Sequence, residues 1–276
     1  MNLNTRNNKS KLNQKMRYLI LSSIIVLLNI SSYSYSFEPK KAGIGGYIST
    51  KVYEERNPID NTFFMDQSGF MLGLVANGDS YTESSYLGYS ARLGVGLVDY
   101  TSAGTGTMQD IPDYHAELNL YAGIPFQKFD LRITPFAGFG YRYLLNASGL
   151  KLSSNGYSGY DRESRYFYMP IGLNFETKPD VKGSHWEFRG EYLHFLFGQQ
   201  KSYLSQVSSS YPDITNDQEK GSGIKVTAKY HFDKQFALEG YMDYWDIADS
   251  KVDITGNFME PRNSTAETGI RFIWSY

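Results

Sequence analysis

Hydrophobic and polar residues alternate with a period of two along most of the chain after residue 36. In segment 87–97 the odd-numbered positions are apolar or aromatic, whereas the even-numbered positions are glycine, serine or arginine. Segment 114–124 repeats this pattern, with His115 and Glu117 on its polar face. Because successive side chains of a β-strand point to opposite faces, both segments are predicted to be strands with one apolar face.

The same test predicts ten strands. They are expected at residues 42–53, 66–76, 85–99, 114–125, 130–145, 165–176, 185–197, 222–232, 236–247 and 264–276. Helical periodicity is hard to find, and the 24 tyrosines, 17 phenylalanines and 26 glycines are typical of strands joined by tight turns. The predicted fold class is therefore all-β, although strand 66–76 alternates less regularly than the others.

The connections between the predicted strands differ in length. Those after even-numbered strands are mostly short, as at 127–129 and 233–235, whereas those after odd-numbered strands are expected to be polar and to run to about twenty residues or more. Bacterial membrane barrels have short periplasmic turns and long outer loops. The pattern thus predicts a membrane-spanning antiparallel up-and-down β-barrel of about ten strands (range roughly 8 to 12), with both termini in the periplasm.

A three-residue turn at 233–235 fixes the register of the two strands beside it. On the predicted lumen face this register forms two opposite-charge pairs, Lys229 with Glu239 and Lys225 with Asp243. Further lumen charges are expected at Arg92, Glu117, Arg142, Glu191 and Arg271. A soluble β-sandwich is the alternative fold, but its polar face would not combine glycine, tyrosine and paired charges in this way. The charge placement favours a barrel with a small, mostly filled lumen.

The N-terminal 36 residues have the features of a signal peptide. Five basic residues precede an apolar run at 19–30, and small residues offer a cleavage site between Ser36 and Phe37. The alternative is a membrane-anchoring helix, but this run is shorter than the roughly 20 residues that a spanning helix needs. We therefore expect residues 1–36 to be a cleaved signal peptide and residues 37–276 to form the barrel domain.

Composition narrows the range of partners. The chain has no cysteine, which excludes a disulfide framework and a lipid-modified cysteine anchor. Residues 37–276 carry 22 basic and 29 acidic side chains, so nucleic acid is not expected as a partner. The glycine-rich segments 104–106 and 221–223 have no predicted helix after them, so no phosphate-binding loop and no cofactor are predicted.

The C-terminal strand ends in alternating apolar residues. These residues are Ile270, Phe272, Trp274 and Tyr276. The pattern resembles the assembly signal of the bacterial outer-membrane β-barrel superfamily. The resemblance implies insertion by the barrel-assembly machinery, a location in the bacterial outer membrane, and contact with its lipid and lipopolysaccharide. We expect a monomer whose loop ligand the sequence does not identify.

The chain also resembles the omptin proteases in length, in strand number and in segment 168–173. That resemblance would imply an acidic pair and an Asp–His pair at the outer rim, which activate water. Neither motif can be placed here, because the loop after Phe197 contains no histidine. The architecture is omptin-like without the catalytic motifs, and we expect the protein not to be an enzyme.

Three groups of residues could still carry chemistry. His115 and His194 are expected near the outer rim, with Asp110 and Asp113 close to His115, either as an acid-base or metal group or as a solvated loop edge. A second group, Asp243, Asp246 and Asp249, could bind a cation or the ions that bridge lipopolysaccharide, or could simply be solvated at a strand end. The third is the tyrosine-rich loop 156–165, which fits either a surface-binding loop or an interfacial aromatic girdle. None has the spacing of a compact ligand set, so no metal is predicted.

The sequence therefore favours a non-enzymatic, integral outer-membrane barrel that serves envelope structure or surface interaction through its extracellular loops. A narrow porin for ions or small solutes is the first alternative, because two predicted strands have a glycine-rich lumen face. An omptin-like surface protease is the least favoured alternative.

Overall fold

The computed structural model describes residues 40–57, 59–149, 151–252 and 258–276. The predicted signal peptide 1–36, with its cleavage site at Ser36 and Phe37, lies outside these residues. Within the described ranges, no helix is long and apolar enough to cross a membrane.

Strands make up nearly all of the regular structure in the described ranges. They are β1 (Lys40–Arg56), β2 (Phe63–Tyr81), β3 (Tyr86–Ser102), β4 (Gly106–Gly123), β5 (Phe126–Lys128), β6 (Leu131–Asn146), β7 (Arg162–Thr177), β8 (His185–Ser202), β9 (Ile214–Gln218), β10 (Gly221–His231), β11 (Phe236–Ile247) and β12 (Asn263–Ser275). One short 3-10 helix, η1 (Leu204–Gln206), precedes β9.

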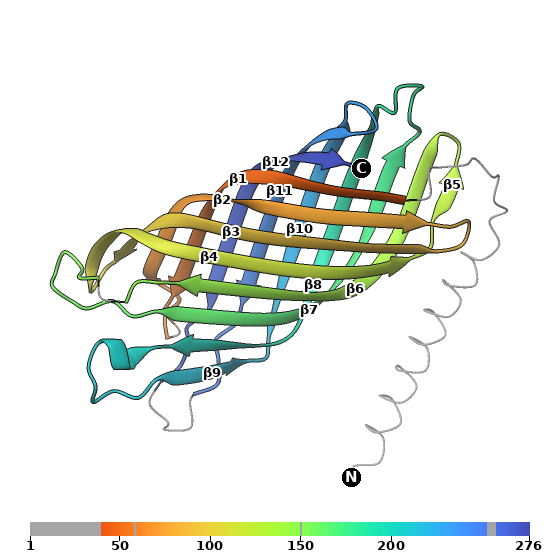
Figure 1. Ribbon diagram of the computed structural model, residues 1–276. Helices are drawn as coiled ribbons and strands as arrows, with labels where there is room; N and C mark the ends of the chain where they lie inside the picture. The colour runs from red at the N-terminus through yellow and green to blue at the C-terminus, as the bar shows by residue number, and fades with distance from the viewer. Residues whose placement is uncertain (1–39, 58, 150, 253–257) are drawn as a thin grey trace, which may run out of the picture. The chain divides into compact units, whose positions relative to one another are not determined.

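Ten of these strands close into an antiparallel barrel (Figure 1). Their order is β10, β11, β12, β1, β2, β3, β4, β6, β7 and β8, and β8 pairs back onto β10. β5 pairs only with β6, and β9 continues the edge of β8 beyond β10. The prediction of an all-β, ten-stranded, membrane-spanning barrel is confirmed, and the barrel has no open sheet edge to satisfy in lipid.

Alternation along each strand separates an apolar outer face from a polar lumen. In β3, the side chain of Leu93 is 61% exposed, whereas that of Arg92 beside it is only 4% exposed. The outward-facing residues of β2, β4 and β12 are likewise large and apolar. This reverses the arrangement of a soluble protein and gives the barrel an outer surface suited to lipid.

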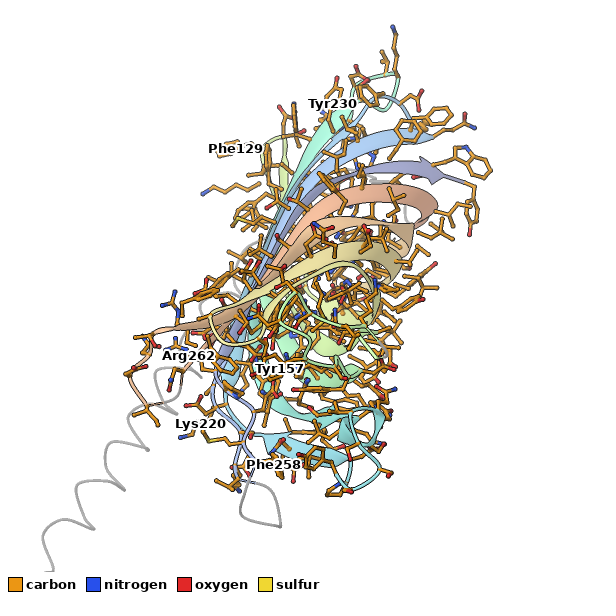
Figure 2. All side chains as sticks on the ribbon, turned by 90° about the vertical axis from the view of Figure 1, so that its left-hand side faces the viewer. Phe129, Tyr157, Lys220, Tyr230, Phe258 and Arg262 are labelled. Carbon is orange, nitrogen blue, oxygen red and sulfur yellow. The ribbon has the colours of Figure 1, made fainter. Side chains whose placement is uncertain are left out.

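The two ends of the barrel differ. At one end, the turn end, the strands are joined by segments 82–85, 124–130, 178–184 and 232–235, and the C-terminus lies there as well. At the other end, the loop end, the connections are 57–62, 103–105, 147–161, 203–220 and 248–262. Figure 2 shows Phe129 and Tyr230 at the turn end and Tyr157, Phe258 and Arg262 at the loop end.

The loop-end connections are shorter than the sequence predicted. The expectation of about twenty or more residues after every odd-numbered strand is wrong: the five connections have 6, 3, 15, 18 and 15 residues, and 57–62 and 103–105 differ most from it. The strands on either side continue as paired β-structure well past the apolar band, so polar residues predicted as loops belong to strands. β2, predicted from weak alternation at 66–76, extends from Phe63 to Tyr81 for the same reason.

Candidate functional site: the charged lumen

The middle of the lumen is occupied by a network of buried ion pairs centred on Arg92 of β3. Its guanidinium lies 3.0 Å from Glu117 of β4, 2.8 Å from Asp243 of β11 and 3.1 Å from Glu267 of β12. These carboxylates come from both sides of the barrel. The alternation of the strands points all four side chains inward, and closure of the barrel brings them together.

Two further groups complete this central network. Lys225 contacts Glu117 and lies 3.8 Å from Asp243. The ring of His115 lies between Glu117, at 3.5 Å, and Glu267, at 3.6 Å. Burying a charge without partners costs several kcal/mol, so the mutual contacts are what permit these groups to remain inside.

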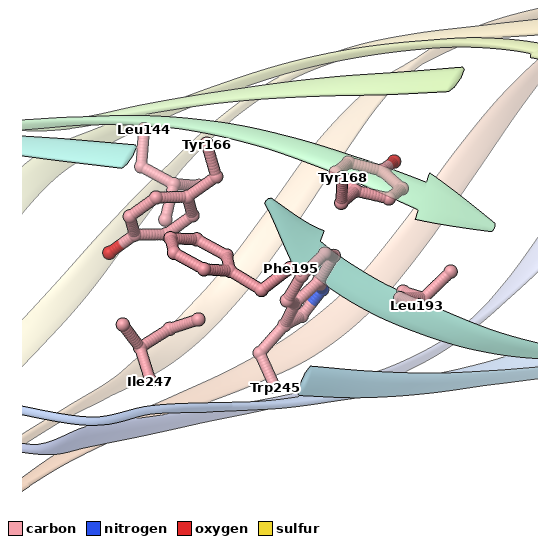
Figure 3. Packing of buried hydrophobic residues seen from close by; sticks show 7 residues of the cluster. All are labelled: Leu144, Tyr166, Tyr168, Leu193, Phe195, Trp245 and Ile247. Atoms are coloured by element: carbon pink, nitrogen blue, oxygen red, sulfur yellow. The ribbon is translucent and has the colours of Figure 1, made fainter. Parts of the chain in front are cut away.

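An aromatic layer packs beside the central network, towards the loop end (Figure 3). Its buried residues are Leu144, Tyr166, Tyr168, Leu193, Phe195, Trp245 and Ile247. The rings of Tyr168 and Trp245 meet edge to face at 4.9 Å, and those of Tyr166 and Phe195 meet at 5.5 Å. Arg142 lies over the Trp245 ring, 5.0 Å from its centroid. This layer, hereafter the aromatic layer, resembles the core of a soluble protein more than the lining of a channel.

A small polar cavity of about 80 Å³ lies in the turn-end half of the lumen. Five carboxylates line it, together with five basic side chains: Arg92, Arg189, Lys225, Lys229 and Arg271. Buried atoms of Arg189, Glu191 and Asn77 beside the cavity have no hydrogen-bond partner among the described residues. Such a cavity has room for a few water molecules, which would satisfy these atoms.

Both charge pairs predicted for the β10–β11 hairpin lie in the lumen, and Lys225, Lys229 and Glu239 line the polar cavity. Lys229 is opposite Glu239 and Lys225 is opposite Asp243, in the register predicted from the turn. Lys229 Nζ lies 3.3 Å from Glu239 Oε2 and 3.2 Å from Glu187 Oε2. Each predicted pair therefore belongs to a larger network, because each lysine contacts a second carboxylate as well.

Two stacked histidines lie at the turn end of the lumen. The rings of His185 and His231 are 4.1 Å apart and nearly parallel. His185 Nε2 lies 3.3 Å from Glu176, and His231 Nε2 lies 3.3 Å from Glu187. The described part of the chain contains no cluster of three or more histidine, cysteine or acidic side chains arranged to hold a metal ion.

A second buried ionic group closes the loop end of the lumen. Arg162, the first residue of β7, contacts both Glu55 of β1 and Glu260 of connection 248–262. The Tyr53 hydroxyl donates to Glu55 at 2.7 Å and lies 3.5 Å from Glu260. Burial raises the pKa of Glu260 to about 7; Arg162 opposes the shift, while Glu55 adds to it. We refer to these four residues as the loop-end cluster.

The outer wall near the loop end carries a groove of about 800 Å³ across β6, β7, β8 and β9. Its floor includes Tyr141, Phe167 and Phe197, whose rings follow one another at 4.9 and 4.7 Å. Polar side chains, among them Arg165 and Gln199, line the rest. The groove combines stacked aromatic rings with charged and amide groups on the lipid-facing side of the barrel.

The predicted histidine group at the outer rim is wrong. His115 lies in the middle of β4, buried in the central network, because β4 begins at Gly106 rather than at residue 114. Asp113 contacts Lys51 in the lumen, whereas Asp110 occupies a strand irregularity and receives no contact from His115. His194 lies in the middle of β8 on the outer face.

The predicted aspartate group does not converge either. Asp243 points into the lumen, while Asp246 lies on the other face and pairs with Arg262 at 2.6 Å. Asp249 accepts a hydrogen bond from the backbone N–H of Arg262. A single cation cannot contact carboxylates on opposite faces of the strand, so this group is not a cation site.

The C-terminal strand places Ile270, Phe272, Trp274 and Tyr276 on the outer face, each at least 43% exposed. In loop 147–161, Tyr157 is exposed at the loop end (Figure 2), while Tyr160 is half-buried.

The sequence reasoning missed the loop-end cluster. Glu55 and Arg162 lie outside the predicted strands, and Glu260 lies in a connection, so no local pattern linked them. A usable signal was that Glu55 continues, two residues after Tyr53, the alternation of β1 beyond the predicted end of the strand at residue 53.

No family model and no curated protein sequence matches this chain. Among solved structures, the fold is similar to the outer membrane protease OmpT from Escherichia coli, with a TM-score of 0.54, 12% identity, and coverage of 89% of this chain and 99% of that chain. The outer membrane protein OprG from Pseudomonas aeruginosa has a TM-score of 0.37, 9% identity, and coverage of 86% and 96%. The toluene transporter TodX from Pseudomonas putida has a TM-score of 0.36, 7% identity, and coverage of 87% and 90%. The chain therefore has the fold of a bacterial outer-membrane β-barrel.

Proposed function

We propose that this chain is a non-enzymatic, integral protein of the bacterial outer membrane, whose closed barrel supports envelope structure and presents its loop end for surface interaction. The observation that carries the proposal is the filling of the lumen. The central network around Arg92 links both sides of the barrel, and the aromatic layer around Trp245 packs beside it. Together they fill much of the lumen, and the polar cavity of about 80 Å³ beside them has room for a few water molecules.

The orientation follows from the connections. Barrels of this class keep short turns in the periplasm and longer loops outside. The turn end would therefore face the periplasm, and the loop end, with Tyr157 and connections 147–161, 203–220 and 248–262, would face the exterior. This orientation is supported by the position of the C-terminus at the turn end.

Lipopolysaccharide is the partner that the outer groove supports. The rings of Tyr141, Phe167 and Phe197 can pack against acyl chains or sugar faces. The polar side chains, in which Arg165 pairs with Glu163 and Gln199 donates to Asp217, can contact sugar hydroxyl groups. The groove lies towards the loop end, so in the proposed orientation it would contact the outer leaflet. We propose the protein to be a monomer in this lipid.

A swelling assay with proteoliposomes tests the closed barrel. The purified protein in vesicles should give no swelling above empty vesicles when they are placed in isotonic solutions of small sugars. A narrow channel is the second candidate, because the turn-end half of the lumen holds a polar cavity. Swelling that falls with increasing solute size would support this channel and contradict the closed barrel.

The non-enzymatic part of the proposal has its own test. Refolded protein, supplemented with lipopolysaccharide, is incubated with a peptide library and analysed by mass spectrometry. We expect no cleavage above a heat-denatured control. Site-specific cleavage would overturn the proposal and would restore the protease alternative.

A further inference from the structure

The loop-end cluster joins opposite walls of the barrel. β1 and β7 lie five strands apart in either direction around the barrel, yet Arg162 of β7 contacts Glu55 of β1. The same guanidinium contacts Glu260, which belongs to connection 248–262. The Glu260 carboxyl therefore joins residues 258–262 to the wall of the lumen at its loop end.

The cluster holds more negative than positive groups. Two buried carboxyl groups, Glu55 and Glu260, share the single guanidinium of Arg162. The Tyr53 hydroxyl has one proton to donate and is closer to Glu55 than to Glu260. Among the residues that the structure describes, the phenols of Tyr160 and Tyr166 also interact with Glu260, and phenols are neutral near pH 7. One of the two carboxyl groups is therefore stable inside only while it is protonated.

Several other contacts of residues 258–262 involve groups that do not titrate near neutral pH. The Glu260 N–H donates to Ser250 Oγ at 2.8 Å, and the Ser250 N–H donates to the Glu260 carbonyl at 2.9 Å. Asn216 Nδ2 donates to the Phe258 carbonyl at 3.1 Å, and Arg262 pairs with the exposed Asp246. The Glu260 carboxyl is thus the group through which proton concentration can act on this segment.

We propose that Glu260 is a pH-sensitive contact that docks residues 258–262 onto the loop end of the lumen when it is protonated and releases them when it is ionised. Ionisation would leave two buried carboxylates for one guanidinium, and this unfavourable charge is relieved when the segment moves Glu260 into water. Docking of residues 258–262 would thus cover or expose the loop end of the lumen according to pH. This regulation does not require the barrel to conduct.

The direction and size of the effect follow from proton linkage. The pKa of Glu260 is about 7 in the docked segment and about 4.5 when it is free in solution. The docked state therefore binds its proton more tightly, and docking is strongest below pH 4.5. Between the free and the raised pKa the ratio of released to docked segments should rise with pH, by at most about tenfold per pH unit, and then level off.

A spin label can follow the segment directly, because the chain contains no cysteine of its own. A nitroxide is attached to the full barrel carrying Phe258→Cys, and its mobility is recorded by electron paramagnetic resonance from pH 4 to 9. We expect the mobile component to grow with pH and to reach a plateau near pH 7 to 8. A spectrum that is unchanged over this range would overturn the proposal.

Variants separate Glu260 from general effects of pH. In Glu260→Gln the mobile component should become independent of pH, and in Glu55→Gln the rise should disappear because Arg162 can then stabilise ionised Glu260 alone. The matched control is Glu219→Gln, which removes an exposed carboxylate paired with Lys251 of the same connection and should keep the full rise. Folding of each variant is checked by heat-modifiable gel mobility. The proposal would be contradicted if the mobile component still rose with pH in both Glu260→Gln and Glu55→Gln. Loss of the rise in Glu219→Gln would also contradict it.

Discussion

The guanidinium Nη2 of Arg92 on β3 lies 2.8 Å from Oδ2 of Asp243 on β11, a strand four positions away around the barrel. The contact therefore crosses the lumen instead of following the wall. Opposite charges thus pack together in the interior of this barrel, where a soluble protein would pack apolar side chains. The outer face, in turn, is apolar because lipid surrounds it.

Removing the central cation should destabilise the barrel. Arg92→Leu leaves Glu117, Asp243 and Glu267 buried with one cation fewer, which should lower the free energy of unfolding by about 3–5 kcal/mol. Urea titration of the protein in lipid vesicles measures the change. The control is Lys178→Leu, in an exposed pair with Asp130, which should cost about 1 kcal/mol or less. Equal effects of the two changes would show that the central network is not a core.

Gly94 makes room for the side chain of Tyr47, which lies along the inner wall over Gly73 and Gly94. A Cβ atom at Gly94 would lie 1.9 Å from the hydroxyl oxygen of Tyr47, so Gly94→Ala should destabilise the barrel by about 1–3 kcal/mol. The Tyr47 hydroxyl has no hydrogen-bond partner in the described part of the chain, so adding Tyr47→Phe should recover part of the loss. Gly190→Ala is the control, because nothing lies within 4 Å of its added Cβ. If the effects of Gly94→Ala and Tyr47→Phe on the unfolding free energy are additive in the double-mutant cycle, this explanation is wrong.

A charge on the outer face tests the lipid-facing band. Leu93 lies outward in the middle of β3, and Leu93→Arg should cost about 2–4 kcal/mol, because arginine is poorly solvated at the bilayer midplane. Val181→Arg, at a fully exposed position in turn 178–184, should leave the unfolding free energy almost unchanged. Vesicle unfolding curves distinguish the two. A neutral effect at Leu93 would mean that this face does not contact lipid.

The C-terminal aromatic should matter for assembly more than for stability. Tyr276 is 73% exposed on the outer face, so Tyr276→Ala should change the unfolding free energy of the purified barrel only slightly. We expect the variant nevertheless to accumulate less heat-modifiable barrel in the outer-membrane fraction of cells, because the assembly signal is weakened. Phe129→Ala, an exposed aromatic in the β5–β6 turn, is the matched control. Normal assembly of Tyr276→Ala would remove the signal assigned to this strand.

Local patterns were sufficient to predict much of the wall. The period-two alternation identified all ten barrel strands, because each strand separates lipid from lumen over its whole membrane span. The β10–β11 register also followed from sequence, since a short turn fixes which residues face each other, and Lys229 is opposite Glu239 as predicted. These features depend on neighbours in the chain or across one turn.

Contacts across the lumen could not be predicted in this way. Lys225 was paired with Asp243, its neighbour across the hairpin, but it lies closer to Glu117 of β4, which only closure of the barrel brings near. His115 was placed at the rim because the polar extension of β4 towards Gly106 lacks the apolar alternation that lipid imposes. Outside the membrane a strand is held by backbone hydrogen bonds to its neighbours and does not need an apolar face. Its sequence there lacks the alternation by which the strand could be predicted.

The central claim is that the lumen is closed, and single-channel recording across a planar lipid bilayer tests it most directly. The refolded barrel, inserted at neutral pH in concentrated potassium chloride, should give no steady conductance steps. A paired measurement with Tyr166→Ala and Trp245→Ala together, which empties much of the aromatic layer, should be more conductive than the unmodified protein if that layer contributes to the seal. Reproducible, long-lived steps from the unmodified protein would contradict the closed lumen.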